Sequence, residues 1–305
     1  MHAKQKKLIA LFTSIMPNET FLTTSIKGLY LFRKENSFPR SPLAYNSEII
    51  ILGQGKKHVY LGNDVYTYDA SHYLVLPVPL PIDCEGKADP DKPILGLTIT
   101  IDPIEVGEIL LDMEDIKKEI QSLPKGIYSA PMSETLYDAT IRLLQAIADH
   151  QDKKVLAPMI KREIIYRVLQ GEKGEILQAL AHRNRRFFQI AKILRKIHES
   201  YSNDFDIEKL AKELDMSSST FHSSFKAVTE TSPLQYIKNV RLHKARILMI
   251  QDGLNANIAA IQVGYESPSQ FNREYKRLFG VTPAKDATTL RGQHMVNPYW
   301  GQRLS

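Results

Sequence analysis

A short segment near the C-terminus carries side chains that can recognise the edges of DNA base pairs. An arginine such as Arg273 can pair with guanine O6 and N7, while Gln270 or Asn272 can pair with adenine N6 and N7. Phe271 and Tyr275 are four residues apart, so they share one apolar face of a helix and turn the polar side chains outward. The segment therefore predicts a helix whose polar face enters a major groove. The outward-facing residues are Ser269, Gln270, Asn272 and Arg273.

The same pattern occurs fifty residues earlier in the chain. The matched positions are Ser217 with Ser267, Ser219 with Ser269, Phe221 with Phe271, Phe225-Lys226 with Tyr275-Lys276, and Ser232-Pro233 with Thr282-Pro283. An ordered series that includes an aromatic–lysine step and a proline favours two copies of one unit over a chance match. In the earlier copy the outward-facing residues are Ser219, Thr220, His222 and Ser223.

Each copy has the composition of a helix-turn-helix. In the first, Asp206 is a good N-cap for a helix over 207–214, and Ser217 or Ser218 caps the helix that follows. In the second, Gly264 supplies the turn between the two helices. We therefore expect two recognition helices in the C-terminal region.

Basic side chains beside both units suit contacts with DNA phosphates, namely Lys226, Lys276 and Arg277. The intervening residues 234–250 predict a helix that would hold the two recognition helices about 34 Å apart, in successive major grooves. Arg241 and Arg246 on this helix allow two interpretations, which are contacts with phosphates or solvation of the helix surface.

Two stretches of this region resemble a known family. Residues 236–248, YIKNVRLHKARIL, resemble the linker helix of the AraC family of bacterial transcription regulators, and residues 263–283, VGYESPSQFNREYKRLFGVTP, are similar to that family's second helix-turn-helix signature. One departure is visible, because Asp286-Ala287 stands where the family usually has an aromatic residue and an arginine. This departure puts in question the turn that closes the second unit after Thr282-Pro283, called the closing turn below. The recognition helix itself is not affected.

The resemblance implies partners and base-reading positions. Double-stranded promoter or operator DNA and RNA polymerase are the implied macromolecular partners, and no cofactor is implied. The sequence does not decide between activation and repression. By position, the family's base-reading residues fall on Ser219, His222 and Ser223 in the first unit and on Ser269, Gln270, Asn272 and Arg273 in the second.

The first hundred residues predict short strands. A buried run over 48–52 is followed by a hairpin, in which 57–61 and 64–68 flank Gly62-Asn63, and further strands are expected at 73–77 and 96–101. Strands at this spacing favour a barrel or sandwich over βαβ units. The prolines of the following stretch, Pro77, Pro79 and Pro81, are expected to lie outside the sheet.

Beyond Pro103 the apolar residues follow a helical period. The stripes are Ile109, Met113, Ile116 and Ile120, then Leu136, Leu143, Leu144 and Ile147, then Ile160, Ile164, Ile165, Val168 and Leu169. Two interpretations stay open. The stripes either form a homodimer interface or pack against the chain's own barrel.

Residues 53–57, 61–70 and 156–167 resemble the cupin-like sensor domain of one AraC subgroup. The resemblance implies a domain that senses a small-molecule effector of unknown identity and that could dimerise. Aromatic residues on the predicted strands, together with one histidine, are the candidate effector-binding side chains, and packing in the barrel core is the alternative for the tyrosines. They are Tyr60, Tyr66, Tyr68 and His72.

Histidine and cysteine usage argues against an enzyme. A catalytic cupin needs a His-x-His pair with further ligands, whereas the barrel offers only His58 and His72, so neither a metal site nor a catalytic site is predicted. The single cysteine, Cys84, has acidic neighbours that disfavour its thiolate, so an inert thiol is preferred over a redox sensor. The alternative that remains is a cupin-like ligand-binding protein or enzyme with a helical appendage.

The distribution of charge allows two interpretations, a polyanionic partner or a solvated basic face without a partner. Residues 190–305 contain 16 Lys and Arg against 11 Asp and Glu, within a chain of 305 residues and net charge +6. The sequence shows neither a signal peptide nor an apolar run long enough for a membrane span, so a cytoplasmic protein without a membrane partner is expected, associated with the nucleoid when it binds DNA.

The predicted fold is therefore α+β. Residues 1–180 are expected to form a cupin-like β-barrel with flanking helices, for effector sensing and possible dimerisation. Residues 181–305 are expected to form an all-α double helix-turn-helix DNA-binding domain.

Overall fold

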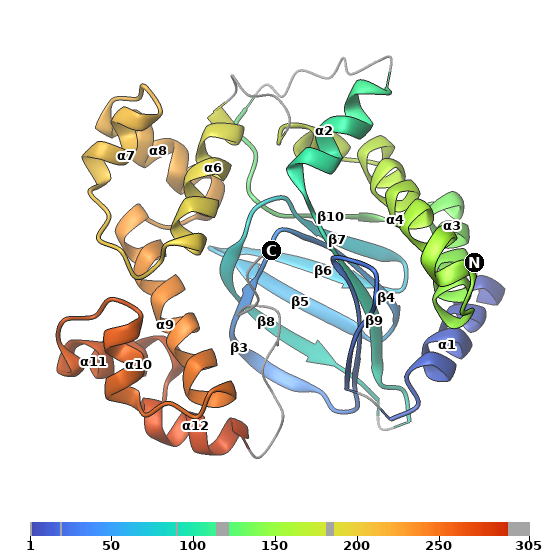
Figure 1. Ribbon diagram of the computed structural model, residues 1–305, viewed down its shortest axis with the longest axis horizontal. Coiled ribbons are helices and arrows are strands. Elements are labelled where there is room, and N and C mark those ends of the chain that lie inside the picture. Colours follow the sequence, from blue (N-terminus) through green and yellow to red (C-terminus); the bar gives the residue numbers. More distant parts are fainter. Residues whose placement is uncertain (1, 19, 90, 114–121, 181–185, 292–305) are drawn as a thin grey trace.

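Strands of the N-terminal half pair into one curled antiparallel sheet, which lies at the centre of Figure 1. The structure is a computed structural model and describes residues 2–18, 20–89, 91–113, 122–180 and 186–291. Within these residues the sheet has ten strands, ordered β1-β2-β9-β4-β7-β6-β5-β8-β3, and β10 pairs with β7. The strands are β1 (Phe21–Thr23), β2 (Leu29–Lys34), β3 (Phe38–Tyr45), β4 (Glu48–Gln54), β5 (Lys56–Leu61), β6 (Asp64–Asp69), β7 (His72–Leu76), β8 (Leu80–Lys87), β9 (Ile94–Thr100) and β10 (Tyr128–Pro131).

The predicted hairpin is confirmed. Leu61 and Asp64 are register partners at the ends of β5 and β6, so Gly62-Asn63 forms a two-residue turn. Gly62 has φ +60°, a left-handed conformation that glycine adopts without steric cost.

The expectation for the prolines is wrong at Pro81, which lies within β8 and pairs with Ala44 of β3. On its other side β8 pairs with β5, and that pairing begins only at Asp83, opposite Tyr60. Pro81 therefore sits where β8 has one partner strand, and its missing N–H does not interrupt a ladder on both sides.

Helices cover the face of the sheet away from the C-terminal region. Helix α1 (His2–Ile15) packs against β4, where a Cβ atom at Gly53 would lie 2.9 Å from the ring of Phe12. Helix α3 (Glu134–Ala148) packs on α1 and on α4 (Asp152–Gln170). The absence of a side chain at Gly53 thus permits the close approach of α1.

The two later apolar stripes are used within the chain. The side chains predicted on α3 are all at most 5% exposed, and those on α4 are at most 1% exposed except for Ile160, which is partly buried. Packing on the chain's own domain is therefore the interpretation that the structure supports for these two stripes. Ile109, on α2 (Pro103–Leu111), is also buried, while Ile116 and Ile120 lie outside the described residues.

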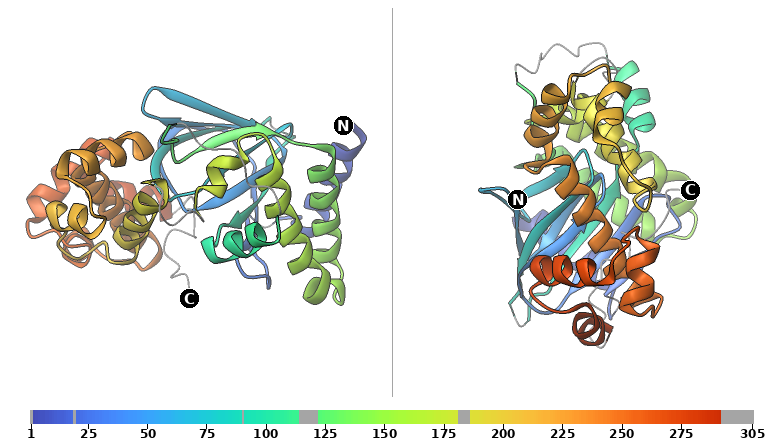
Figure 2. Two further views of the ribbon diagram at one scale, coloured as in Figure 1. Left: turned by 90° about the horizontal axis from the view of Figure 1, so that it is seen from above. Right: turned by 90° about the vertical axis from the view of Figure 1, so that its left-hand side faces the viewer.

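The described part of the C-terminal region is helical and lies at the opposite end of the molecule (Figure 2). Its helices are α6 (Arg186–Glu199), α7 (Ile207–Glu213), α8 (Ser218–Thr229), α9 (Pro233–Gln251), α10 (Ala256–Gln262), α11 (Pro268–Phe279) and α12 (Pro283–Arg291). The short helix α5 (Gly174–Gln178) precedes them. The predicted domain boundary between 180 and 181 stays a prediction, because residues 181–185 lie outside the described residues.

The first helix-turn-helix unit shares a core with the sheet domain. Phe221 and Phe225 of α8 belong to the same apolar cluster as the strands, whereas the second unit has a core of its own around Phe271 and Tyr275. The hydroxyl of Tyr236 in α9 donates a hydrogen bond to the carbonyl of Pro79, just before β8. The sheet domain therefore contacts the linker helix directly.

A polar contact also joins the sheet domain to the end of α8. The Nζ atom of Lys125 lies 2.6 Å from Asp64 Oδ2, on β6, and 2.7 Å from Glu230 Oε1, the C-cap residue of α8. The backbone N–H of Gly126 donates to the carbonyl of Val228 at 2.9 Å. These contacts place the end of one recognition helix against the sheet domain.

Candidate DNA interface

Helix α8 presents a small polar face to solvent. Ser217 caps it by accepting a hydrogen bond from the N–H of Thr220 at 3.2 Å, which decides between the two candidate caps. Phe221 and Phe225 are 0% exposed and anchor the opposite face. The predicted DNA-contacting side chains on this helix are exposed, except for the half-buried Thr220: Ser219, Thr220, His222, Ser223 and Lys226.

Helix α11 presents larger and more strongly hydrogen-bonding side chains. Ser267 caps it by accepting from the N–H of Gln270 at 3.3 Å, and Pro268 occupies its first turn. Phe271 and Tyr275 are 0% exposed. The predicted DNA-contacting side chains are exposed, except for the half-buried Gln270: Ser269, Gln270, Asn272, Arg273, Lys276 and Arg277.

The two units differ by one residue in the turn. The N–H of Met216 bonds to the carbonyl of Ala211, and the equivalent bond in the second unit joins Tyr265 to Ala260, forty-nine residues later. From the caps onward the offset is the predicted fifty, so the second turn is one residue longer. Gly264 accommodates this turn with φ +88°.

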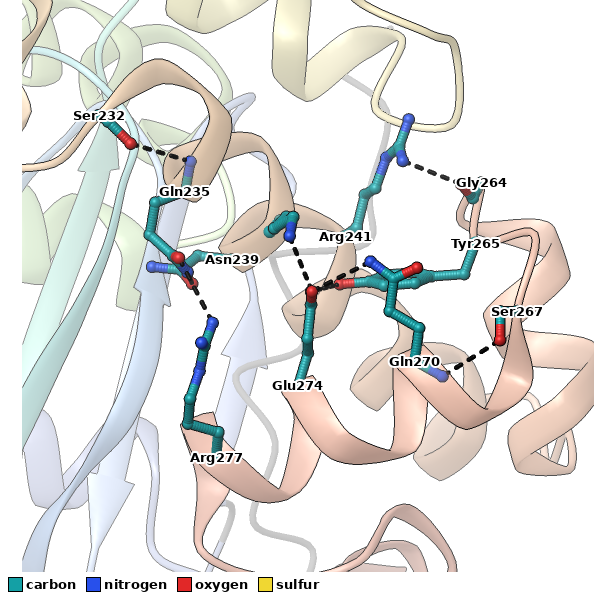
Figure 3. Close-up of polar contacts among 11 residues, drawn as sticks. Ser232, Gln235, Asn239, Arg241, Gly264, Tyr265, Ser267, Gln270, Glu274 and Arg277 are labelled. Carbon is teal, nitrogen blue, oxygen red and sulfur yellow. Dashed lines mark hydrogen bonds and ion pairs between the residues drawn. The ribbon is translucent and has the colours of Figure 1, made fainter.

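Arg241 ties the two units to the linker helix. Its guanidinium donates to three backbone carbonyls, those of Tyr201 (2.8 Å) and Asn203 (2.9 Å) before α7 and that of Gly264 (2.9 Å) in the second turn. The contact with Gly264 is drawn in Figure 3. Neither interpretation offered for Arg241 from the sequence included this role. Its acceptors lie in the loop just before the first unit and in the turn of the second, so Arg241 connects both regions to the linker helix.

The closing turn is stabilised by a residue at the point where the sequence departs from the family pattern. Asp286 of α12 is 5% exposed, and its carboxylate accepts from the Arg246 guanidinium and from the Tyr275 hydroxyl. Arg246 also donates to the carbonyl of Pro42 in β3 at 3.2 Å, so it too has a structural role. The altered sequence therefore still forms a closing helix.

The side chains predicted for effector binding lie in different environments. Tyr68 is 0% exposed, and its hydroxyl lies 3.4 Å from that of Tyr45. Tyr66 lies on the same face of the β5–β6 hairpin as Tyr68. Tyr60, on β5, lies on the other face, where the Arg40 Cζ atom is 4.0 Å from the centre of its ring. His72 is exposed at the start of β7. Their role in effector binding stays a prediction.

A lysine inside the sheet escaped the sequence interpretation. Lys57 alternates with Val59 and Leu61, so it faces inward, and its Nζ atom lies 4.6 Å from the centre of the Phe32 ring. Burial lowers the pKa of Lys57 below its usual value, and the opposing effects of the nearby Cys84 and Glu48 are smaller. The period-two pattern of 57–61 is the signal that could have identified an inward-facing cation.

Cys84 is buried on the inward face of the sheet, the same face as Lys57. It is 0% exposed, and the Tyr45 hydroxyl donates to its Sγ atom at 3.1 Å. Burial raises the pKa of the Cys84 thiol, which keeps it protonated and unreactive. This environment supports the inert thiol.

The two barrel histidines have separate partners. The Nδ1 atom of His58 lies 2.8 Å from the hydroxyl of Thr67, and that of His72 lies 2.9 Å from the hydroxyl of Ser71. Within the described ranges, no group of three His, Cys, Asp or Glu side chains is arranged to hold a metal ion. No helix in the same ranges is long and apolar enough to cross a bilayer.

Comparisons with known proteins agree with this architecture. The family model for the AraC-type transcriptional regulator N-terminus matches residues 25–176, and a helix-turn-helix domain model matches residues 210–288. The chain is 27% identical over 179 residues to the virulence regulon transcriptional activator VirF of Yersinia enterocolitica, and 28% identical over 170 residues to the thermoregulatory protein LcrF of Yersinia pestis. These alignments cover 58% and 55% of this chain, and 65% and 62% of the respective relatives, which is less than two thirds of their length.

Solved structures show the same fold. ToxT of Vibrio cholerae, as an apo variant, superimposes with a TM-score of 0.60 at 13% identity, covering 90% of this chain and 98% of that one. Wild-type ToxT with a bound unsaturated fatty acid superimposes with a TM-score of 0.57 at 15% identity, covering 90% and 97%. From the two domain matches, the relatives and the shared fold, we conclude that the chain belongs to the AraC family, a family of transcription regulators and not of enzymes, and carries an AraC-type N-terminal domain.

Proposed function

We propose that this protein is a sequence-specific DNA-binding transcription regulator whose two recognition helices read successive major grooves of promoter or operator DNA. The observation that carries the proposal is the arrangement of α8 and α11. Both are capped, both present a polar face to solvent, and both pack against the one helix α9. Arg241 supports a fixed spacing between them, because it donates to backbone carbonyls in the loop before α7 and in the turn before α11. In this proposal Arg241 acts inside the protein, while Lys226, Lys276 and Arg277 contact phosphates.

Binding to the DNA immediately upstream of the protein's own gene tests the proposal. We would measure fluorescence anisotropy across a salt series, with random-sequence duplex as competitor. Tight binding that survives the competitor and weakens steeply with salt supports a specific regulator, whereas binding that the competitor abolishes contradicts specificity for that site. Lys27→Ala, in the exposed turn before β2, is a matched control for Lys276→Ala because both remove one exposed lysine.

The proposal extends to the other partners. A regulator of this kind would act in the cytoplasm, associate with the nucleoid when bound and contact RNA polymerase at promoters. A homodimer would use exposed apolar side chains of α4, because the buried stripe of that helix is occupied within the chain. These side chains are Val155, Leu156 and Met159. Sedimentation of the wild type and of Met159→Glu tests the dimer, since a dimer through this face would dissociate in the variant.

We also propose that the sheet domain senses an acidic small molecule. The ToxT structure of the same fold contains an unsaturated fatty acid, and in this chain Lys57 places a cation among aromatic rings inside the sheet. The probe is oleate, with the melting temperature and the affinity for DNA as readouts. A rise in melting temperature in the wild type that is lost in Lys57→Met supports sensing at this position. An equal rise in both proteins places the ligand elsewhere, and a ligand that binds without changing DNA affinity contradicts a regulatory role.

A further inference from the structure

The Glu274 carboxylate lies where the second recognition helix meets the linker helix and the turn before it (Figure 3). Its Oε1 atom accepts from Lys238 Nζ at 2.8 Å and from Gln270 Nε2 at 3.2 Å, and its Oε2 atom accepts from the Tyr265 hydroxyl at 2.7 Å. The side chain is only 12% exposed. Burial raises the pKa of Glu274, but the hydrogen bonds from Lys238, Tyr265 and Gln270 outweigh it and lower the pKa, so the group is an anion at neutral pH.

Gln270 is the candidate adenine-reading side chain on this helix. An amide recognises adenine by accepting from N6 with its oxygen and donating to N7 with its nitrogen, so the orientation of the amide decides what it reads. The oxygen and nitrogen of a glutamine are otherwise interchangeable by rotation about one bond. An ionised carboxylate accepts hydrogen bonds and donates none, so it can bond only the nitrogen end of Gln270.

We propose that Glu274 is a positioning residue for base readout, which holds the Gln270 amide with its nitrogen bonded inside the protein and its oxygen free for adenine N6. The second N–H of the same nitrogen is then left for adenine N7. This inference rests on the proposed DNA-binding function and names the residue that sets specificity at one position of the site.

The first recognition helix has no counterpart of this arrangement. Fifty residues earlier, the position of Glu274 is occupied by Ser224, which is buried, and that of Gln270 by Thr220. Thr220 pairs with the hydroxyl of Ser217 at 2.8 Å. A change at Glu274 should therefore alter the half of the site that α11 reads and leave the half that α8 reads unchanged.

The test is selection of binding sites from a random duplex pool by the full-length wild type, Gln270→Ala and Glu274→Gln, with base preference scored at every position. A glutamine at 274 can accept from the nitrogen of Gln270 or donate to its oxygen, so it no longer fixes the amide. We expect one strongly preferred A·T pair in the wild-type site to lose about tenfold in preference in both variants. Other positions should keep their preferences.

Two further variants separate geometry from charge and from folding. Glu266→Gln removes one exposed negative charge from the same unit without touching Gln270, and it should keep the wild-type base preference. Glu274→Asp keeps the charge but is one methylene shorter, so it should lose the same preference as Glu274→Gln. Glu274→Asp also provides a second measurement of base preference if Glu274→Gln fails to fold.

Several results would overturn the inference. In the Gln270→Ala background, Glu274→Gln should have no additional effect at that base pair, so an equal additional loss there contradicts positioning through Gln270. Unchanged preference in Glu274→Gln, or weakened preference at positions throughout the site, contradicts it as well. A wild-type selection that yields no preferred sequence is a different outcome, because it refutes the proposed function itself.

Discussion

Arg246 of the linker helix and Asp286 of the last described helix face each other in a two-point ion pair. The Nε and Nη2 atoms of Arg246 lie 2.8 and 3.2 Å from the two carboxylate oxygens of Asp286. The Tyr275 hydroxyl donates to the same carboxylate at 2.7 Å, and the Arg246 guanidinium lies 4.4 Å from the centre of the Phe279 ring. The closing helix is thus joined to both the linker helix and the second recognition helix.

Asp286→Asn should destabilise the protein by about 3 kcal/mol, because removing one partner of a buried pair leaves the other charge uncompensated. Urea denaturation, followed by circular dichroism, measures this loss. Asp252→Asn is the matched control, since Asp252 is exposed at the end of α9, and its effect should stay within about 0.5 kcal/mol. Equal effects of the two substitutions would show that the ion pair does not hold the closing helix.

Arg273→Ala should relax base preference at one position of the site. Arg273 is exposed on α11, where its guanidinium can make the two hydrogen bonds that distinguish guanine. We expect a loss of about 1–3 kcal/mol on the specific site and little change on random DNA. Anisotropy titrations with both duplexes measure the difference, and equal losses on the two would show that Arg273 does not read a base.

The sequence predicted those features of the fold that depend on residues close together in the chain. The caps and apolar faces of α8 and α11 follow from residues a few positions apart, and the offset of fifty follows from counting. The strands around Gly62-Asn63 follow from alternation and turn chemistry in the same way.

Long-range partners were not predictable from the same patterns. The acceptors of Arg241 are backbone carbonyls 23 to 40 residues away, which no side-chain pattern marks. Asp286 looked like a disruption of the closing turn because its partner, Arg246, lies 40 residues earlier. Pro81 looked like a strand breaker because the pairing of each edge of β8 is set only by the complete sheet.

Lys276→Ala should weaken binding to all DNA by a similar factor. Lys276 is exposed in the last turn of α11, a position suited to a phosphate contact that carries no sequence information. Removing one such contact should reduce the slope of log K against log salt by about 1. Titrations at four or more salt concentrations, on specific and random duplexes, check the slope. A loss confined to the specific duplex would instead assign Lys276 to base readout.

The stability of the second unit should depend on pH through His243. This side chain is 4% exposed in α9, and burial together with the nearby Arg246 lowers its pKa to about 3. The unfolded chain takes up a proton near pH 6.5, whereas the folded protein does not, so the contribution of His243 is complete above that pH and is lost as the pH falls toward 3.

Glu48 changes the stability with pH in the opposite direction. The effect of His243 is therefore isolated by comparing the wild type with His243→Gln, because both proteins contain Glu48. Burial raises the pKa of Glu48 to about 8, so its contribution to stability decreases as the pH rises from about 4.5 to 8 in both proteins. Between pH 7 and pH 5 the wild type should lose about 2 kcal/mol relative to His243→Gln, measured as urea unfolding free energies. Any pH-independent cost of the substitution cancels in this difference.

His150→Gln, at an exposed position, is the control, and its stability should change with pH as that of the wild type does. A His243→Gln profile parallel to the wild type would contradict the prediction, because it would show that His243 takes up its proton in the folded protein as readily as in the unfolded chain.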